Sequence, residues 1–252
     1  MAIQLIIFSI LFLSSLIRST FGFGDALIAM PLLSMVVGVQ FATPLVALIS
    51  MTIASLLLVQ HRHGIHFNSM KLLSIYTIIG IPIGLLMLKG LYEPAVKVIL
   101  ALILIGFSAY KIAKPKLFHL VDDKLAFLFG MGAGILGGAY NTNGPPVIIY
   151  GTLRQWPPEQ FRATLQGYFF ITGTITVLSH GLVGLWTTSV WFYYILSLPI
   201  VFISIGLGRL FHRQIPINQF DNYVYVFLMV IGIMLVVDTL PNLTKLIHFW
   251  PG

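Results

Sequence analysis

The chain has 252 residues, of which 58% are hydrophobic and 8% charged, and its formal net charge is +7. Soluble domains carry roughly 25% charged residues, so this composition excludes a soluble globular fold. The basic residues lie in short links between apolar runs, which is typical of membrane topology signals and of contact with anionic lipid headgroups rather than nucleic acid. Because the chain has no cysteine, disulfides and thiolate metal sites are also excluded.

Ten apolar segments succeed one another along the chain. They cover residues 2–17, 26–37, 43–60, 70–88, 94–113, 125–138, 145–153, 163–179, 187–208 and 222–240. Each is predicted to be helical, because the hydrocarbon core of a bilayer is about 30 Å thick and asks for about 20 apolar residues per crossing. The sequence therefore predicts an all-α, multi-pass membrane protein with 8 to 10 membrane helices, six of them long enough to span alone.

Each half of the chain opens with an interrupted pair of short apolar segments. Residues 18–25 separate the first pair, and residues 139–144 separate the segments 125–138 and 145–153 of the second. The sixteen residues of segment 2–17 extend about 24 Å as a helix, which is less than a full crossing. This segment is expected to be retained rather than cleaved as a signal peptide, because no clear small-residue cleavage site follows it.

The two interruptions align when the sequence is laid on itself. The correspondences pair Gly22 with Gly137, Pro31 with Pro146, and Gln40-Phe41-Ala42-Thr43 with Gln160-Phe161-Arg162-Ala163-Thr164. Ile81-Pro82-Ile83 also matches Leu198-Pro199-Ile200 further along. These matches predict two homologous transmembrane repeats, residues 1–116 and 117–252.

The distribution of Lys and Arg separates two topologies. If each interrupted pair crossed once, the basic residues outside the first interruption would divide seven against six, with no bias. If each pair enters and returns, one side collects Arg18, Arg62, Lys71, Lys111, Lys114, Lys116, Lys124, Arg154, Arg162, Arg209 and Arg213, and the other keeps Lys89, Lys97 and Lys245. Eleven against three is the asymmetry of the positive-inside rule, so the second model is preferred. It predicts inverted repeats and both termini outside a bacterial-type inner (plasma) membrane, whether the pairs are full spans or re-entrant hairpins.

The two interruptions are the candidate solute-binding site. Inverted repeats with broken first helices point to a transport site near the bilayer midplane, because freed backbone groups are tolerated only around a cavity. A helix that starts there attracts anions. The candidate substrate-binding residues are Gly22, Gly24, Asn141, Thr142, Asn143, Gly144 and Pro145. The alternative is that glycine and proline here only permit close helix packing.

Three charged residues are further candidates. Asp25 is flanked by apolar sequence, and an intramembrane carboxylate is a functional hypothesis by default. It would carry a coupling proton, pair with Arg18, or cap the helix that starts at Ala26. Arg162 opens a long segment, and its guanidinium would either offer bidentate donors to a substrate oxyanion or act as an interfacial anchor.

Other chemistry has little support in the sequence. His61, His63 and His66 resemble a metal-binding cluster, but they fall in a basic link after a long apolar segment, so no metal site is predicted. No nucleotide-binding loop and no paired His and carboxylate motif is present, and neither a cofactor nor an enzymatic activity is predicted.

Three stretches resemble the TauE/SafE sulfite exporter family, also called the sulfonate uptake permeases. They are Phe21 to Leu33, Gly134 to Pro146, and Gln160-Phe161-Arg162-Ala163-Thr164. The resemblance extends over essentially the whole chain and implies an inner-membrane permease for sulfite, sulfoacetate or other small organosulfur anions. The first interruption departs from the family, with Gly-Phe-Gly-Asp where a denser glycine run is expected.

The leading hypothesis is a secondary transporter of small anions that works by alternating access, with protons or cations as candidate coupling ions. A channel-like anion pathway and a non-transporting membrane scaffold or sensor subunit are the alternatives.

Overall fold

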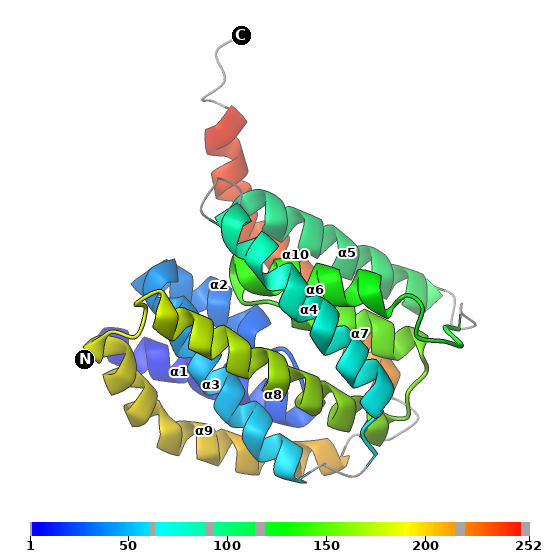
Figure 1. Cartoon of the computed structure of the whole chain (residues 1–252). Helices are drawn as coiled ribbons and strands as arrows, with labels where there is room; N and C mark the ends of the chain where they lie inside the picture. Colours follow the sequence, from blue (N-terminus) through cyan, green and yellow to red (C-terminus); the bar gives the residue numbers. More distant parts are fainter. Residues whose placement is uncertain (1, 61–63, 89–92, 114–118, 215–219, 248–252) are drawn as a thin grey trace.

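The structure is a computed structural model that describes residues 2–60, 64–88, 93–113, 119–214 and 220–247. Within these ranges every regular element is an α-helix (Figure 1). The helices are α1 (Ala2–Phe21), α2 (Asp25–Val37), α3 (Val39–Gln60), α4 (Phe67–Leu88), α5 (Glu93–Ala113), α6 (Ala126–Tyr140), α7 (Gly144–Leu153), α8 (Pro158–Leu182), α9 (Thr188–Gln214) and α10 (Phe220–Ile247). The predicted all-α class is confirmed, and each predicted apolar segment corresponds to a helix of its own, with Leu125 and Thr187 lying one residue before α6 and α9.

The first helix is longer than predicted. The expectation of a short first helix is wrong, because α1 has 20 residues and extends about 30 Å, continuing through Arg18 to Phe21. The charge does not end the helix, since Arg18 is buried and paired inside the protein. By length and composition, four helical stretches among the described residues are apolar enough to cross a membrane. They are Ile3–Phe21, Val39–Gln60, Thr188–His212 and Asn222–Thr239.

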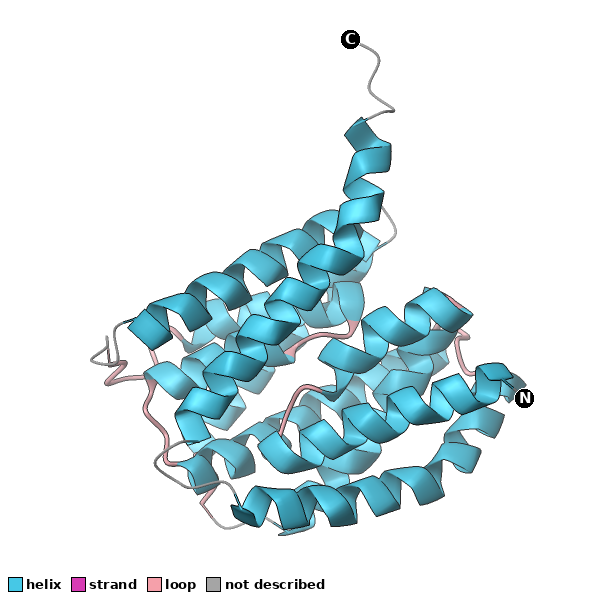
Figure 2. Ribbon diagram, turned by 180° about the vertical axis from the view of Figure 1, so that it is seen from behind, coloured by secondary structure: helices cyan, strands magenta, loops and turns pink. Residues whose placement is uncertain are grey.

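The two halves of the chain are interleaved. Helix α1 packs against α9, α4 against α6, α3 against α8, and α5 against α10, so each of these pairs joins one half to the other. The predicted repeat boundary between residues 116 and 117 lies outside the described residues. Figure 2 shows loop segments in the interior of the bundle, apart from the loops at its ends.

Glycines let α4 and α6 approach closely. A Cβ on Gly134 would overlap the carbonyl oxygen of Thr77, and one on Gly80 would lie 2.6 Å from the carbonyl oxygen of Met131. The Thr77 hydroxyl donates to the carbonyl oxygen of Gly130 at 3.0 Å. Gly134 lies in a stretch that resembles the family, so part of that glycine pattern serves helix packing.

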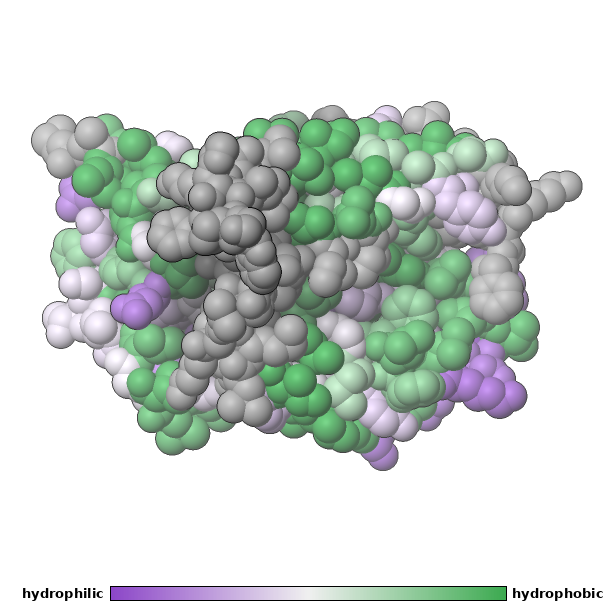
Figure 3. Space-filling model, turned by 90° about the horizontal axis from the view of Figure 1, so that it is seen from above, coloured by the Kyte–Doolittle hydropathy of each residue, from purple (hydrophilic) through white to green (hydrophobic). Residues whose placement is uncertain are grey.

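The outer surface of the bundle is apolar. Large hydrophobic side chains are exposed along α9 and α10, among them Phe202, Ile203, Val226 and Val230. In Figure 3 hydrophobic residues cover much of the visible face, and hydrophilic residues gather toward its edges. An apolar exterior around buried polar groups is the arrangement expected of a protein whose solvent is lipid.

Candidate solute-binding site

The two interruptions meet inside the bundle. Gly22 and Gly24 have φ values of +91° and +102°, and Asn141 has φ +52°, so left-handed residues end α1 and α6. Both interruptions line one cavity of about 40 Å³, which exceeds the 10–15 Å³ that a single water needs. The lining residues are Arg18, Gly24, Asp25, Ala26, Leu27, Ala47, Ser50, Asn141, Thr142, Asn143, Gly144, Phe169, Gly173 and Thr176.

The starts of two helices open onto this cavity. Helix α2 begins at Asp25 and α7 at Gly144, and neither start has a side-chain cap hydrogen bond. Their first-turn N–H groups are therefore donors on the cavity side, except at Pro145 and Pro146, which have none. The Asn141 Nδ2 atom is buried and has no hydrogen-bond partner among the described residues. The cavity thus presents hydrogen-bond donors near Gly144, which suits an anion.

A buried ion pair forms one wall of the cavity. Arg18 Nη1 lies 2.7 Å from Asp25 Oδ2, and the two side chains are 2% and 7% exposed. The Ser50 hydroxyl donates to the same carboxylate oxygen. Asp25 is the first residue of α2 and Gly24 is its N-cap, so the hypothesis that Asp25 caps the helix is wrong. The structure instead shows Asp25 paired with Arg18, which is another of the predicted alternatives.

Two further contacts hold the Arg18 guanidinium. Its Nη2 atom lies 3.4 Å from Gln166 Oε1, and its Cζ atom lies 4.7 Å from the centre of the Phe169 ring. Arg18 Nε is buried without a hydrogen-bond partner among the described residues. The guanidinium therefore keeps its Nε–H uncommitted while it is held from three directions, by α2 and twice by α8.

Arg162 lies beside the first interruption rather than in the cavity lining. The side chain is buried, and Nη2 donates to the carbonyl oxygen of Ser19 at 2.7 Å. One turn later on α8, Gln166 Nε2 donates to the carbonyl oxygen of Gly22 at 2.6 Å. The start of α8 thus caps the carbonyl end of α1, where the helix dipole favours a cation.

The predicted site residues divide into two groups. Gly24, Asp25, Arg18, Asn141, Thr142, Asn143 and Gly144 all line the cavity. Gly22, Pro145 and Arg162 lie outside its lining, and an added Cβ on Gly22 would approach Arg162 Cγ to 3.2 Å. Gly22 therefore faces the residue that caps α1.

Sequence reasoning missed seven lining residues and the Gln166 contact; the missed lining residues are Ala26, Leu27, Ala47, Ser50, Phe169, Gly173 and Thr176. Ser50 comes from α3, and Phe169, Gly173 and Thr176 come from α8. Together with Arg162 and Gln166, the α8 residues recur at steps of three or four, which places them on one helix face. This spacing was the signal that could have identified them.

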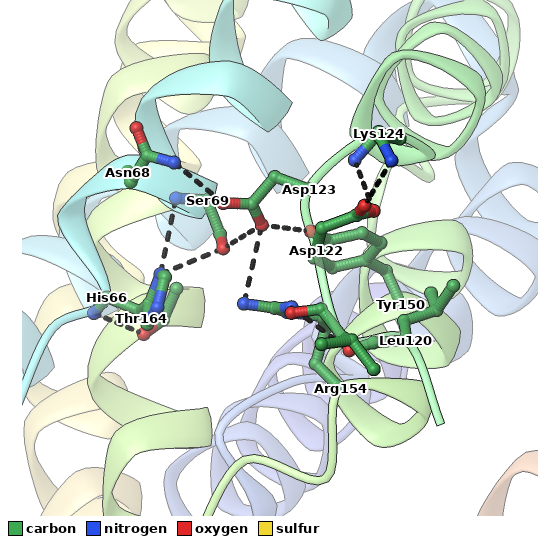
Figure 4. A network of polar contacts seen from close by, with 11 residues as sticks. His66, Asn68, Ser69, Leu120, Asp122, Asp123, Lys124, Tyr150, Arg154 and Thr164 are labelled. Carbon is green, nitrogen blue, oxygen red and sulfur yellow. Dashed lines mark hydrogen bonds and ion pairs between the residues drawn. The ribbon is translucent and has the colours of Figure 1, made fainter. Parts of the chain in front are cut away.

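A second polar cluster lies at the end of the bundle where α7 ends and α8 begins (Figure 4). Asp123 is at its centre and accepts hydrogen bonds from Asn68 at 2.7 Å, from Ser69 at 2.5 Å and from the Tyr150 hydroxyl, with Arg154 Nη2 at 3.7 Å. Burial raises the pKa of Asp123, but these hydrogen bonds and the Arg154 charge lower it by more, so its pKa lies below 3.8.

This cluster includes one of the three predicted link histidines. His66 Nδ1 lies 2.8 Å from the Ser69 hydroxyl, and its ring stacks on Trp156. The backbone N–H of His66 donates to Thr164 Oγ1 at 2.9 Å. His61 and His63 lie outside the described residues. Among the residues that are described, no group of three or more candidate metal ligands is found.

Comparison with known proteins gives a family match that includes both interruptions. The model of the family described as "Sulfite exporter TauE/SafE" matches residues 7–235. A protein from Cupriavidus necator described as "Probable sulfite/organosulfonate exporter TauE" is 25% identical over 196 residues, which cover 75% of this chain and 77% of that protein. No solved structure matches the chain.

Proposed function

Because the chain belongs to the TauE/SafE sulfite exporter family, we propose that it is a secondary transporter that moves sulfite or a small organosulfonate across the cell membrane. The observation that carries this proposal is the cavity between the two interruptions, with Arg18 in its wall and two uncapped helix starts at its edge. The relative from C. necator is described as an exporter of these anions, which supports the same substrate class here.

The chemistry of the cavity suits a small oxyanion. Arg18 Nε, Asn141 Nδ2 and the first-turn N–H groups of α2 and α7 supply donors that replace the anion's hydration shell. A cavity of about 40 Å³ holds about three waters at 10–15 Å³ each, so it matches a solute of a few heavy atoms rather than a large organic ligand.

The packing of the helices supports inverted repeats and alternating access. If the halves correspond in order, α1 matches α6, and α4 matches α9. The α1–α9 contact then has its counterpart in α6–α4, while α3–α8 and α5–α10 each map onto themselves. Such a two-fold pattern favours rocking of one repeat against the other around a central site. In this proposal the end that carries Asp123 and Arg154 faces the cytoplasm, and both termini lie outside.

The test is flux in proteoliposomes that contain the purified protein. We expect saturable uptake of radiolabelled sulfite that is accelerated by unlabelled sulfite or a sulfonate inside the vesicles, because counterflow requires a carrier. Flux that neither saturates nor shows counterflow would favour the channel-like pathway. Absence of flux and of binding across sulfite, thiosulfate, sulfonates and carboxylates would refute the organosulfur assignment.

A further inference from the structure

Asp25 is paired with Arg18, the cation that a transported anion would need as its partner. The Asp25 Oδ2 atom lies 2.7 Å from Arg18 Nη1, in a cavity that is otherwise lined by neutral groups. Within the lining, all of which is described, Arg18 and Asp25 are the charged side chains. The formal charge of the lining is therefore zero when both are ionised, and +1 when Asp25 carries a proton. An anion that entered the ionised cavity would be repelled by the Asp25 carboxylate.

Among the residues that the structure describes, the neighbours of Asp25 contribute no second charge that would replace Arg18. From α3 it faces Ser50, and across the cavity the second interruption presents Asn141, Thr142 and Asn143. From α10, Phe227 lies against Gly24.

Other titratable groups of the surrounding helices lie outside the cavity lining. On α8, Arg162 is directed at the Ser19 carbonyl oxygen, and His180 lies one turn beyond the lining residue Thr176. On α10, Tyr223 is exposed, and Asp238 follows Phe227 by eleven residues, about 16 Å along the helix. Asp25 is thus the group in the lining that can take up a proton.

We propose that Asp25 takes up one proton when the anion binds, and that the anion then replaces the carboxylate on Arg18. This inference rests on the proposed function. The proton comes from water on the loading side and forms the O–H bond of the neutral carboxylic acid, while the Arg18–Asp25 ion pair gives way to an Arg18–anion pair. On release, the anion leaves, Asp25 returns the proton to water, and the ion pair forms again. Anion and proton therefore cross together, with no net charge.

The contacts around the pair are suited to this exchange. Arg18 remains held by Gln166 and by the Phe169 ring when Asp25 releases it, so the guanidinium stays in the cavity. The Ser50 hydroxyl donates to the ionised carboxylate and, after rotation, accepts a hydrogen bond from the neutral acid. Neither state of Asp25 is left without a partner.

The same charge count defines the substrate class. A lining of charge +1 is balanced by a singly charged anion, such as hydrogen sulfite or a monosulfonate. A dianion would leave one buried negative charge without compensation, which is strongly unfavourable. We expect ethane-1,2-disulfonate to compete at least about tenfold more weakly than methanesulfonate, because one uncompensated charge shifts binding by at least that factor.

The experiment measures anion and proton movement in the same vesicles. Proteoliposomes loaded with a pH-sensitive dye receive one of two anions. One is sulfite, and the other is methanesulfonate, which is used because its charge does not change with pH. For the wild-type protein we expect one proton per anion and a rate that does not respond to an imposed membrane potential. For Asp25→Asn, which mimics the protonated acid, we expect counterflow to persist without proton movement and to become independent of pH.

The matched control is Asp122→Asn, which makes the same change at an exposed aspartate outside the cavity. It should behave as the wild type. Ser50→Ala provides a second variant, in which proton coupling should persist because Asp25 is unchanged.

Wild-type anion flux without proton movement would overturn the inference and leave the proposed function intact, as would proton coupling that survives in Asp25→Asn. Absence of wild-type flux with both probes would overturn the proposed function and the inference with it.

Discussion

Two aspartates of this chain lie near an arginine in different surroundings. Asp25 is in the interior, 2.7 Å from Arg18, and its other polar contact is the hydroxyl of Ser50. Asp123 lies in the link before α6, with Arg154 at 3.7 Å and with hydrogen bonds from Asn68, Ser69 and Tyr150. The interior carboxylate depends on one cation, whereas the carboxylate at the bundle end is held by several neutral donors.

This difference separates a contact that can be exchanged from one that fastens elements together. The donors to Asp123 come from the start of α4 and from α7, so their bonds tie three segments at one end of the bundle. Asp25 borders a cavity, and any anion in that cavity competes for the same guanidinium. We therefore propose transport chemistry at Asp25 and a structural role at Asp123.

The largest effect is expected for Arg18→Gln. It removes the cation from the cavity and leaves Asp25 buried without a counter-charge, which costs about 3–5 kcal/mol of stability. Sulfite flux should fall at least about 100-fold, the factor that corresponds to 2.7 kcal/mol of lost binding. Flux and thermal unfolding are measured on the same detergent-solubilised preparation and its proteoliposomes.

The double variant Arg18→Gln/Asp25→Asn distinguishes the two contributions. Because both charges are absent, unfolding should return toward the wild-type temperature while flux remains low. If the double variant transported sulfite at the wild-type rate, Arg18 would have no part in anion binding.

A smaller effect is expected for Gln166→Leu. The variant keeps the size of the side chain but loses the bonds to Arg18 and to the Gly22 carbonyl oxygen, so the guanidinium is positioned less well. The KM for sulfite should rise about tenfold, the equivalent of one lost hydrogen bond to a charged group, while the maximal rate changes less. Equal losses in both parameters would indicate a general structural defect instead.

Much of the fold could be predicted from the sequence, because the length of an apolar run determines where a membrane helix lies. The interruptions at residues 22–24 and 141–143 were visible as glycine and polar residues within apolar sequence. The length of α1 was predicted wrongly, because a charged residue such as Arg18 normally ends an apolar run. Its burial in the helix depends on the ion pair with Asp25, which the sequence does not reveal.

The contacts that complete the site could not be predicted in this way. Gln166 and Gly22 are 144 residues apart, and the ion-pair partner of Arg18 is seven residues away across a turn. Neither distance follows from periodicity within one helix. Only the spacing of Gln166, Phe169 and Gly173 along α8 was a signal in the sequence, because steps of three and four place these residues on one helix face.

Asp123→Asn should affect stability and leave the affinity for sulfite unchanged. An amide accepts fewer hydrogen bonds than a carboxylate and loses the charge that attracts Arg154, so the variant should lose about 1–3 kcal/mol of unfolding free energy. Denaturation in detergent measures this loss, and Asp122→Asn, at the neighbouring exposed position, should show no comparable change. A raised KM for sulfite in Asp123→Asn would contradict the separation of the two regions.

The smallest effect is expected for pH, through the stability that the hydrogen bonds of Asp123 contribute. The hydrogen bonds keep the pKa of Asp123 below its ordinary value of 3.8, despite the opposing effect of burial. Its contribution to stability is therefore complete above that ordinary value and is lost as the pH falls through the lower, folded-state pKa. Acid unfolding of the wild type should be steeper below about pH 4 than that of Asp123→Asn, which has no group to titrate there. Parallel acid-unfolding curves would indicate that the Asp123 carboxylate adds no stability beyond what an amide supplies.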